Sequence, residues 1–147
     1  MQNRISKIIL SVCYLGRIKF APGTIASLVC VLMWFFIPYN LEMRFCLLFL
    51  FLLIGFYFCW EYSKNAILGE DPSMIVIDEF SGMSIALCII EPNVYIYLSG
   101  FLLFRFFDIL KPSFIYASQK VEHGIGIMLD DILSGIIVLF ILIGISF

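Results

Sequence analysis

Five of the eleven acidic residues of this chain lie inside or at the edge of apolar segments. They are Asp78, Glu79, Asp108, Asp130 and Asp131. A charge at the centre of a membrane helix costs about 2.5–3.5 kcal/mol on insertion scales, so intramembrane acids usually face a counter-ion, a bundle interior or a water-filled cavity. Hard divalent cations such as Mg²⁺ take oxygen ligands, commonly carboxylates together with water and substrate phosphates. Three acidic patches therefore suggest a bound cation, and the lack of His-rich or Cys-rich clusters disfavours zinc and copper.

Two cations accompany one of these acids. Arg105, Asp108 and Lys111 follow one another at intervals of three, which places them on one face of a helix. One interpretation is structural, with Arg105 and Asp108 neutralising each other and Lys111 extending to the membrane surface. In the other, Asp108 binds a metal and the two cations bind a phosphate, because a guanidinium donates bidentately and an ammonium acts as a point charge.

Asp130 and Asp131 are adjacent, so on a helix their side chains project about 100° apart and at most one can face a shared centre squarely. Helix capping is the structural alternative, because acids near a helix N-terminus complement its dipole and its free N–H groups. Two consecutive acids exceed what a cap requires, which favours a functional role. Ser134 and Gly135, one turn later, would leave space beside them for a neighbouring helix or a ligand.

Asp78 and Glu79 form a second adjacent pair, and Gly82 opens room one turn after Asp78 on the same helix face. A buried pair of acids with nothing to bind would repel itself. This pair could therefore serve a metal or a proton transfer.

A basic loop leading into a helix is predicted for the segment KFAPGTIAS at 19–27, with Thr24 as a candidate N-cap. Such a helix start can bind an anion through its free N–H groups and its dipole. The chain has neither a G-x-x-x-x-G-K-[ST] loop nor a G-x-S-x-G elbow. Nucleotide hydrolysis and a serine-type mechanism therefore have no support.

The elements that position these residues are predicted to be membrane helices. The chain is 63% hydrophobic and 14% charged over 147 residues, whereas soluble domains average about 25% charged residues. We therefore expect an all-α fold, a polytopic membrane helical bundle with four to five membrane-embedded helices, forming a single domain over residues 1–147. The expected segments are 24–38, 41–62, 74–90, 94–110 and 127–147, of which the first is short.

The distribution of lysine and arginine predicts the orientation of the bundle. With a cytoplasmic N-terminus, all basic residues except Arg44 fall on the cytoplasmic side, and Arg44 is expected to extend from a helix end to the opposite surface. The five acids then lie toward the cytoplasmic ends of the third, fourth and fifth segments. If the first segment does not span the membrane, the same count places the charges differently.

Four strings of the sequence, taken in order, resemble the phosphatidylglycerophosphatase A family. They are KFAPGTIAS at 19–27, DPSMIVIDEFSG at 71–82, FRFFDILKP at 104–112 and GIGIMLDDILSG at 124–135. The resemblance implies a small multi-pass enzyme of the bacterial inner (cytoplasmic) membrane with its active site facing the cytoplasm. It implies hydrolysis of the terminal phosphomonoester of phosphatidylglycerol phosphate, giving phosphatidylglycerol and phosphate with Mg²⁺ as cofactor. The expected partners are a membrane phospholipid substrate and the lipid bilayer, with no nucleic acid.

The resemblance also implies roles for nine residues. The metal ligands or catalytic carboxylates would be Asp78, Glu79, Asp108, Asp130 and Asp131. The substrate phosphate would be held by Lys19, Thr24, Arg105 and Lys111. Either a water or one of the carboxylates could be the nucleophile. The rival hypothesis is a small ion- or proton-coupled membrane transporter that uses the same acids, which should then lie near the middle of the membrane.

Overall fold

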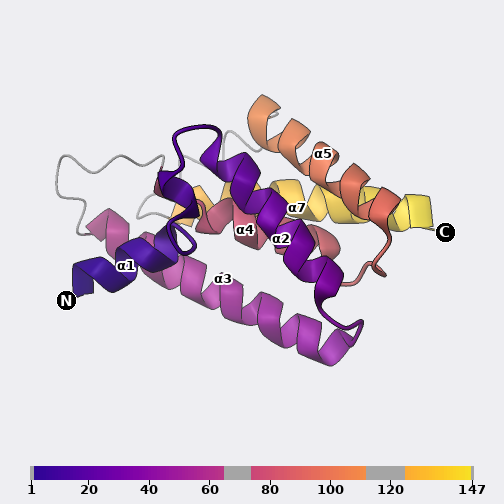
Figure 1. Cartoon of the computed structure of the whole chain (residues 1–147), viewed down its shortest axis with the longest axis horizontal. Helices are drawn as coiled ribbons and strands as arrows, with labels where there is room; N and C mark the ends of the chain where they lie inside the picture. The colour runs from indigo at the N-terminus through magenta and orange to yellow at the C-terminus, as the bar shows by residue number, and fades with distance from the viewer. Residues whose placement is uncertain (1, 65–73, 112–124, 147) are drawn as a thin grey trace.

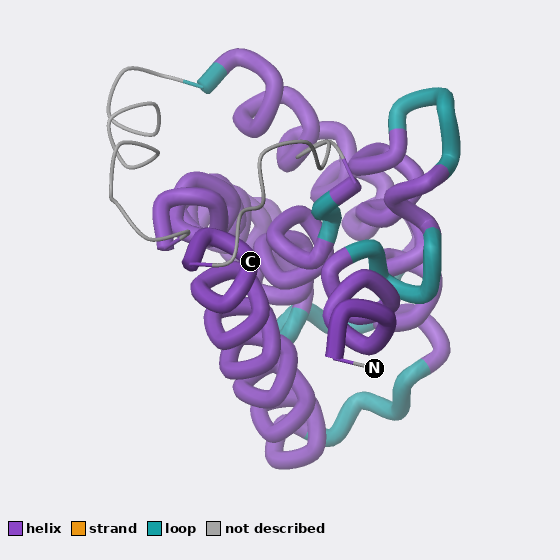
Figure 2. Tube along the Cα trace, turned by 90° about the vertical axis from the view of Figure 1, so that its left-hand side faces the viewer, coloured by secondary structure: helices purple, strands orange, loops and turns teal. Residues whose placement is uncertain are grey.

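The structure is a computed structural model that describes residues 2–64, 74–111 and 125–146 of the chain (Figure 1). Its described part is helical with short connections and contains no strand (Figure 2). The elements are α1 (Gln2–Leu10), the 3-10 turn η1 (Leu15–Arg17), α2 (Pro22–Phe36), α3 (Leu41–Lys64), α4 (Ile77–Leu87), α5 (Val94–Leu110) and α7 (Ile125–Ser146). The predicted all-α class is therefore confirmed.

The short helix α4 lies at the centre of the bundle, packed most extensively against α7 and also against α2, α3 and α5 (Figure 1). Nine of its eleven residues are buried. Two buried serines keep its polar groups satisfied, since Ser81 Oγ donates to the carbonyl of Ile77 at 2.7 Å and Ser84 Oγ to that of Phe80 at 2.8 Å. α4 is thus enclosed by protein.

Large apolar side chains are exposed along one face of each of three outer helices, at intervals of four residues. They include Leu28, Leu32 and Phe36 on α2, Phe49, Leu53 and Tyr57 on α3, and Leu98, Leu102 and Phe106 on α5. This spacing places each set in a stripe along its helix. Stripes of this kind in water would be unfavourable, whereas a hydrocarbon surrounding would accommodate them.

Two described helices, α3 and α7, are long and apolar enough to cross a membrane, with 24 and 22 residues. This is fewer than the four to five membrane-embedded helices that were predicted. At about 1.5 Å per residue, the 15 residues of α2 and the 11 of α4 are shorter than a hydrocarbon core of about 30 Å. Hydropathy predicted a membrane-embedded helix at the α4 segment because apolar residues accompany burial in protein as well as burial in lipid.

Arg44 differs from its prediction, because its side chain is fully buried instead of extending to a membrane surface. Its guanidinium donates to carbonyl groups at the C-terminal ends of α2 and α4 and to one tyrosine. The acceptors are the carbonyls of Trp34, Ile37, Pro38, Leu87 and Ile90 and the hydroxyl of Tyr97, at 3.0–3.5 Å. A cation at two helix C-termini satisfies carbonyls that have no partner within their own helices. Arg44 thus joins α2, α4 and α5 at one end of the bundle.

Candidate active site and metal centre

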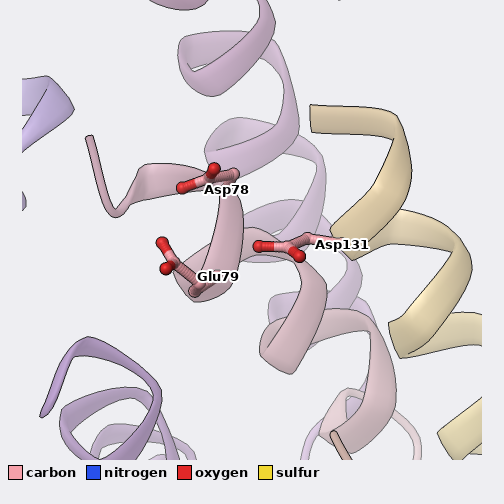
Figure 3. Close-up of side chains that lie close together, drawn as sticks. All are labelled: Asp78, Glu79 and Asp131. Atoms are coloured by element: carbon pink, nitrogen blue, oxygen red, sulfur yellow. The ribbon is translucent and has the colours of Figure 1, made fainter. Parts of the chain in front are cut away.

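The opposite end of α4 carries a cluster of three carboxylates (Figure 3). Asp78 and Glu79 lie in the first turn of α4, and Asp131 lies in α7. One oxygen atom from each side chain lies within 4.8 Å of the other two. Residues more than 50 positions apart in the sequence are thereby brought into one site, at the end of α4 remote from Arg44.

Asp108 adds a fourth carboxylate from the last turn of α5. It is buried and forms an ion pair with Arg105, whose Nη1 atom lies 2.6 Å from Oδ2 of Asp108. Its side chain is also within hydrogen-bonding reach of Asp131. The Arg105–Asp108 pair expected by the structural interpretation is therefore present, and it borders the acid cluster.

Asp130 and Asp131 are both buried but face different partners. Asp131 joins the cluster, whereas Asp130 Oδ2 accepts a hydrogen bond of 2.7 Å from Nζ of Lys111, the C-cap residue of α5. This divergence agrees with the angle predicted for adjacent helical residues. Burial lowers the pKa of Lys111, but the hydrogen bond to Asp130 and the charges of Asp130, Asp131 and Asp108 outweigh burial and raise that pKa above its usual value. Lys111 is thus a protonated cross-link between α5 and α7.

The start of α2 lies against this cluster through Gly23. A Cβ atom on Gly23 would collide with Oε1 of Glu79 and would lie 3.4 Å from Nη1 of Arg105. Gly23 was not among the predicted site residues, although the Pro-Gly pair before a helix was a visible signal of an unusual approach. The N-cap prediction for Thr24 is wrong. Ala21 occupies that position with a left-handed backbone, so half-buried Thr24 falls in the first turn.

Lys19 is exposed in the connection between η1 and α2. It forms no ion pair with any residue in the described part of the chain. Of the four predicted phosphate-binding residues, the structure therefore places Arg105 and Lys111 in contact with the acids. Thr24 follows Gly23, which lies against Glu79. For Lys19, the described part of the chain shows no ion pair with the acids.

The donor atoms of the cluster suit a hard divalent cation. Oδ1 of Asp78 and Oε2 of Glu79 are buried and have no hydrogen-bond partner within the described residues. Buried carboxylate oxygens without partners are costly, and carboxylates this close repel one another. An ion bound by oxygen ligands would satisfy both requirements, and Mg²⁺ commonly takes one or two carboxylates and leaves positions for water or phosphate. The residues present therefore fit a Mg²⁺ site.

The fold and this cluster define a helical membrane protein with an all-oxygen acidic site at one end of its bundle. The chain belongs to the phosphatidylglycerophosphatase A family, whose model matches residues 8–146.

Three named relatives accompany this match. A Haemophilus influenzae protein named "Phosphatidylglycerophosphatase A" is 38% identical over 137 residues, covering 90% of this chain and 83% of the relative. An Escherichia coli protein with the same name is 36% identical over 128 residues, covering 83% and 72%. A Bacteroides thetaiotaomicron protein named "Putative phosphatidylinositol-3-phosphatase" is 36% identical over 141 residues, covering 89% and 86%. No solved structure matches the chain.

Proposed function

We propose that this chain is a Mg²⁺-dependent lipid phosphatase that hydrolyses the terminal phosphomonoester of phosphatidylglycerol phosphate to phosphatidylglycerol and phosphate. The observation that carries the proposal is the cluster of Asp78, Glu79 and Asp131, with its buried unpartnered oxygens, beside Arg105. Family membership and the names of two relatives support the same activity. A transporter has no comparable support, because the family and the named relatives are phosphatases.

The carboxylates of Asp78, Glu79 and Asp131 would hold the Mg²⁺, with Asp108 beside them. When bound, the ion supplies positive charge that neutralises phosphoryl oxygens. Two routes to the product fit the cluster. In one, a carboxylate takes a proton from a water whose oxygen attacks phosphorus; in the other, a carboxylate oxygen attacks phosphorus and water later cleaves the resulting acyl phosphate. In both, the bond between phosphorus and the glycerol oxygen breaks, and that oxygen leaves as a hydroxyl after taking up a proton.

Arg105 would bind the phosphoryl oxygens of the substrate. Its Nε atom is buried and donates to no group in the described part of the chain, so it is available to an incoming oxygen. Its ion pair with Asp108 would hold the guanidinium in place. Lys111, by pairing with Asp130, would orient the α5 and α7 ends of the site and add positive charge near the substrate.

The bundle would reside in the bacterial inner membrane with four to five embedded helices and with the acid cluster at the cytoplasmic face. α3 and α7 would cross the bilayer, and the exposed apolar stripes on α2 and α5 would face lipid. The exposed cations Arg4, Arg17 and Lys64 belong to α1, η1 and the end of α3, all at the acid end of the bundle in Figure 1. Such a bias of basic residues is typical of a cytoplasmic side.

Purified protein in detergent is expected to release phosphate from phosphatidylglycerol phosphate in the presence of Mg²⁺ and to lose this activity in excess EDTA. Adding Mg²⁺ back should restore the rate, because chelation removes the ion and leaves the protein folded. A parallel assay with phosphatidylinositol 3-phosphate tests the substrate that one relative's name suggests. Equal release in EDTA, or no release from either lipid, would overturn the proposal.

Arg105→Lys is expected to lower kcat/KM for the lipid by about 10–100-fold, the equivalent of one lost charge-assisted hydrogen bond. A lysine keeps the charge but lacks the planar fork that can contact Asp108 and a phosphoryl oxygen together. Steady-state kinetics of the variant measure the change, and Arg17→Lys, at an exposed position, is the matched control. Unchanged kinetics in Arg105→Lys would show that only charge is required at this position.

A further inference from the structure

The two helices that carry the acid cluster share a short sequence pattern, D-x-x-S-G. It occurs as DEFSG at 78–82 in α4 and as DILSG at 131–135 in α7. In each helix the aspartate precedes the glycine by four residues, so the two lie one turn apart on the same face. Both serines are buried and donate to the carbonyl four residues earlier, which leaves them no hydroxyl proton for a ligand.

The two glycines of this pattern lie at the contact between α4 and α7. A Cβ atom on Gly135 would collide with the carbonyl oxygen of Gly82 and would lie 3.2 Å from its Cα. A Cβ atom on Gly82 would collide with the carbonyl oxygen of Asp131 and would lie 2.9 Å from the ring of Phe104. Backbone therefore touches backbone at this crossing, an approach that small residues permit between membrane helices.

Three other helical glycines, Gly55, Gly100 and Gly144, are not held against the backbone of a neighbouring helix in this way. The atoms nearest to a Cβ on Gly55 would be the flexible end of Met128 and one serine hydroxyl, and those nearest to a Cβ on Gly100 would be side chains of neighbouring helices. A Cβ on Gly144, in α7 itself, would meet nothing within 4 Å. Within α7, the need for glycine at position 135 is therefore local to the turn that follows Asp131.

We infer that Gly82 and Gly135 are positioning residues that set the separation of Asp78 and Asp131, so that these carboxylates can bind one divalent cation. This inference rests on the proposed function. Ligand oxygens lie about 2.0–2.1 Å from Mg²⁺, so the carboxylates of one ion must stay close together. A methyl group at the crossing would push the helices apart by roughly 1 Å before ordinary van der Waals contact is reached. The carboxylate oxygens, now within 4.8 Å of one another, would then separate as well.

The inference is tested by binding of Mg²⁺ itself, measured by titration calorimetry on detergent-solubilised protein without any lipid substrate. Gly135→Ala and Gly82→Ala are each expected to weaken Mg²⁺ binding by about 10–100-fold, the effect typical of residues that orient metal ligands. Gly144→Ala makes the same chemical change in the same helix and should bind Mg²⁺ as the wild-type chain does. Circular dichroism would establish that all three variants keep their helices.

A compensating substitution separates positioning from general destabilisation. Asp131→Glu adds one methylene, which should overfill the site between the wild-type helices and weaken Mg²⁺ binding. In the Gly135→Ala background the same change should restore binding, because the longer side chain reaches across the wider crossing. The same substitution would thus weaken Mg²⁺ binding in the wild-type chain and strengthen it in the Gly135→Ala chain. Independent structural effects do not produce such a coupling.

Four outcomes would overturn the inference. Unchanged Mg²⁺ binding in both glycine variants would show that the crossing does not set the site, and additive effects in the double variant would show a purely structural role. If neither glycine variant folds, Asp131→Glu alone decides the question, since unaltered binding would contradict a fixed spacing. A wild-type chain that binds no divalent cation would refute the proposed function as well, which distinguishes that failure from the others.

Discussion

Asp131→Asn is expected to lower kcat/KM for phosphate release by about 10²–10³-fold, a loss comparable to removing one preorganised electrostatic group from an active site. Asp131 is the member of the cluster that lies within reach of the acids of both α4 and α5. Asparagine keeps the shape of the side chain and one oxygen but removes the negative charge that would attract Mg²⁺. The loss should therefore appear mainly as a higher Mg²⁺ requirement and a lower maximal rate.

Although Asp131→Asn should lower activity, it should not lower the stability of the metal-free protein. Asp131 is buried beside like charges, so neutralising it removes repulsion in the metal-free protein. In EDTA, the apparent melting temperature of Asp131→Asn should equal or exceed that of the wild-type chain. Glu91→Gln, at an exposed position beyond the far end of α4, is the control and should alter neither activity nor melting. Near-normal activity in Asp131→Asn would assign this acid a structural role.

Local sequence signals predicted the parts of the fold that have local causes. The predicted helix at 94–110 coincides with α5, because the side chain of Asn93 accepts hydrogen bonds from the N–H groups of Tyr95 and Ile96 and so caps the helix. The divergence of Asp130 and Asp131 likewise follows from the helical repeat alone. Such features depend on a few neighbouring residues, which a single sequence contains.

Features that depend on contacts between helices could not be predicted in the same way. The spacing of Arg105, Asp108 and Lys111 suggested one shared helix face, but Lys111 is closest to Asp130 on another helix. Hydropathy marked the α4 segment as apolar and could not show that its neighbours are helices instead of lipid. The role of Gly23 depends on Glu79, 56 residues away. Each of these depends on the packing of several helices at once.

Arg44→Met is expected to destabilise the protein by several kcal/mol, because each buried acceptor left without a donor costs about 1–3 kcal/mol. Methionine fills much of the same volume but donates no hydrogen bond. The carbonyls at the ends of α2 and α4 and the hydroxyl of Tyr97 would lose a buried donor. The apparent melting temperature in detergent should fall, whereas kcat/KM measured well below that temperature should be unchanged, because the acids lie at the other end of α4.

Arg44→Lys distinguishes the charge of the side chain from its geometry. An ammonium has three donors from one atom, so it cannot reach the six acceptors that surround the planar guanidinium. If bonding to both helix ends holds the bundle together, Arg44→Lys should melt close to Arg44→Met and well below the exposed control Arg17→Met. A lysine variant as stable as the wild-type chain would instead mean that a positive charge near two helix C-termini is sufficient. Equal melting of Arg44→Met and Arg17→Met would contradict any stabilising role for the buried arginine.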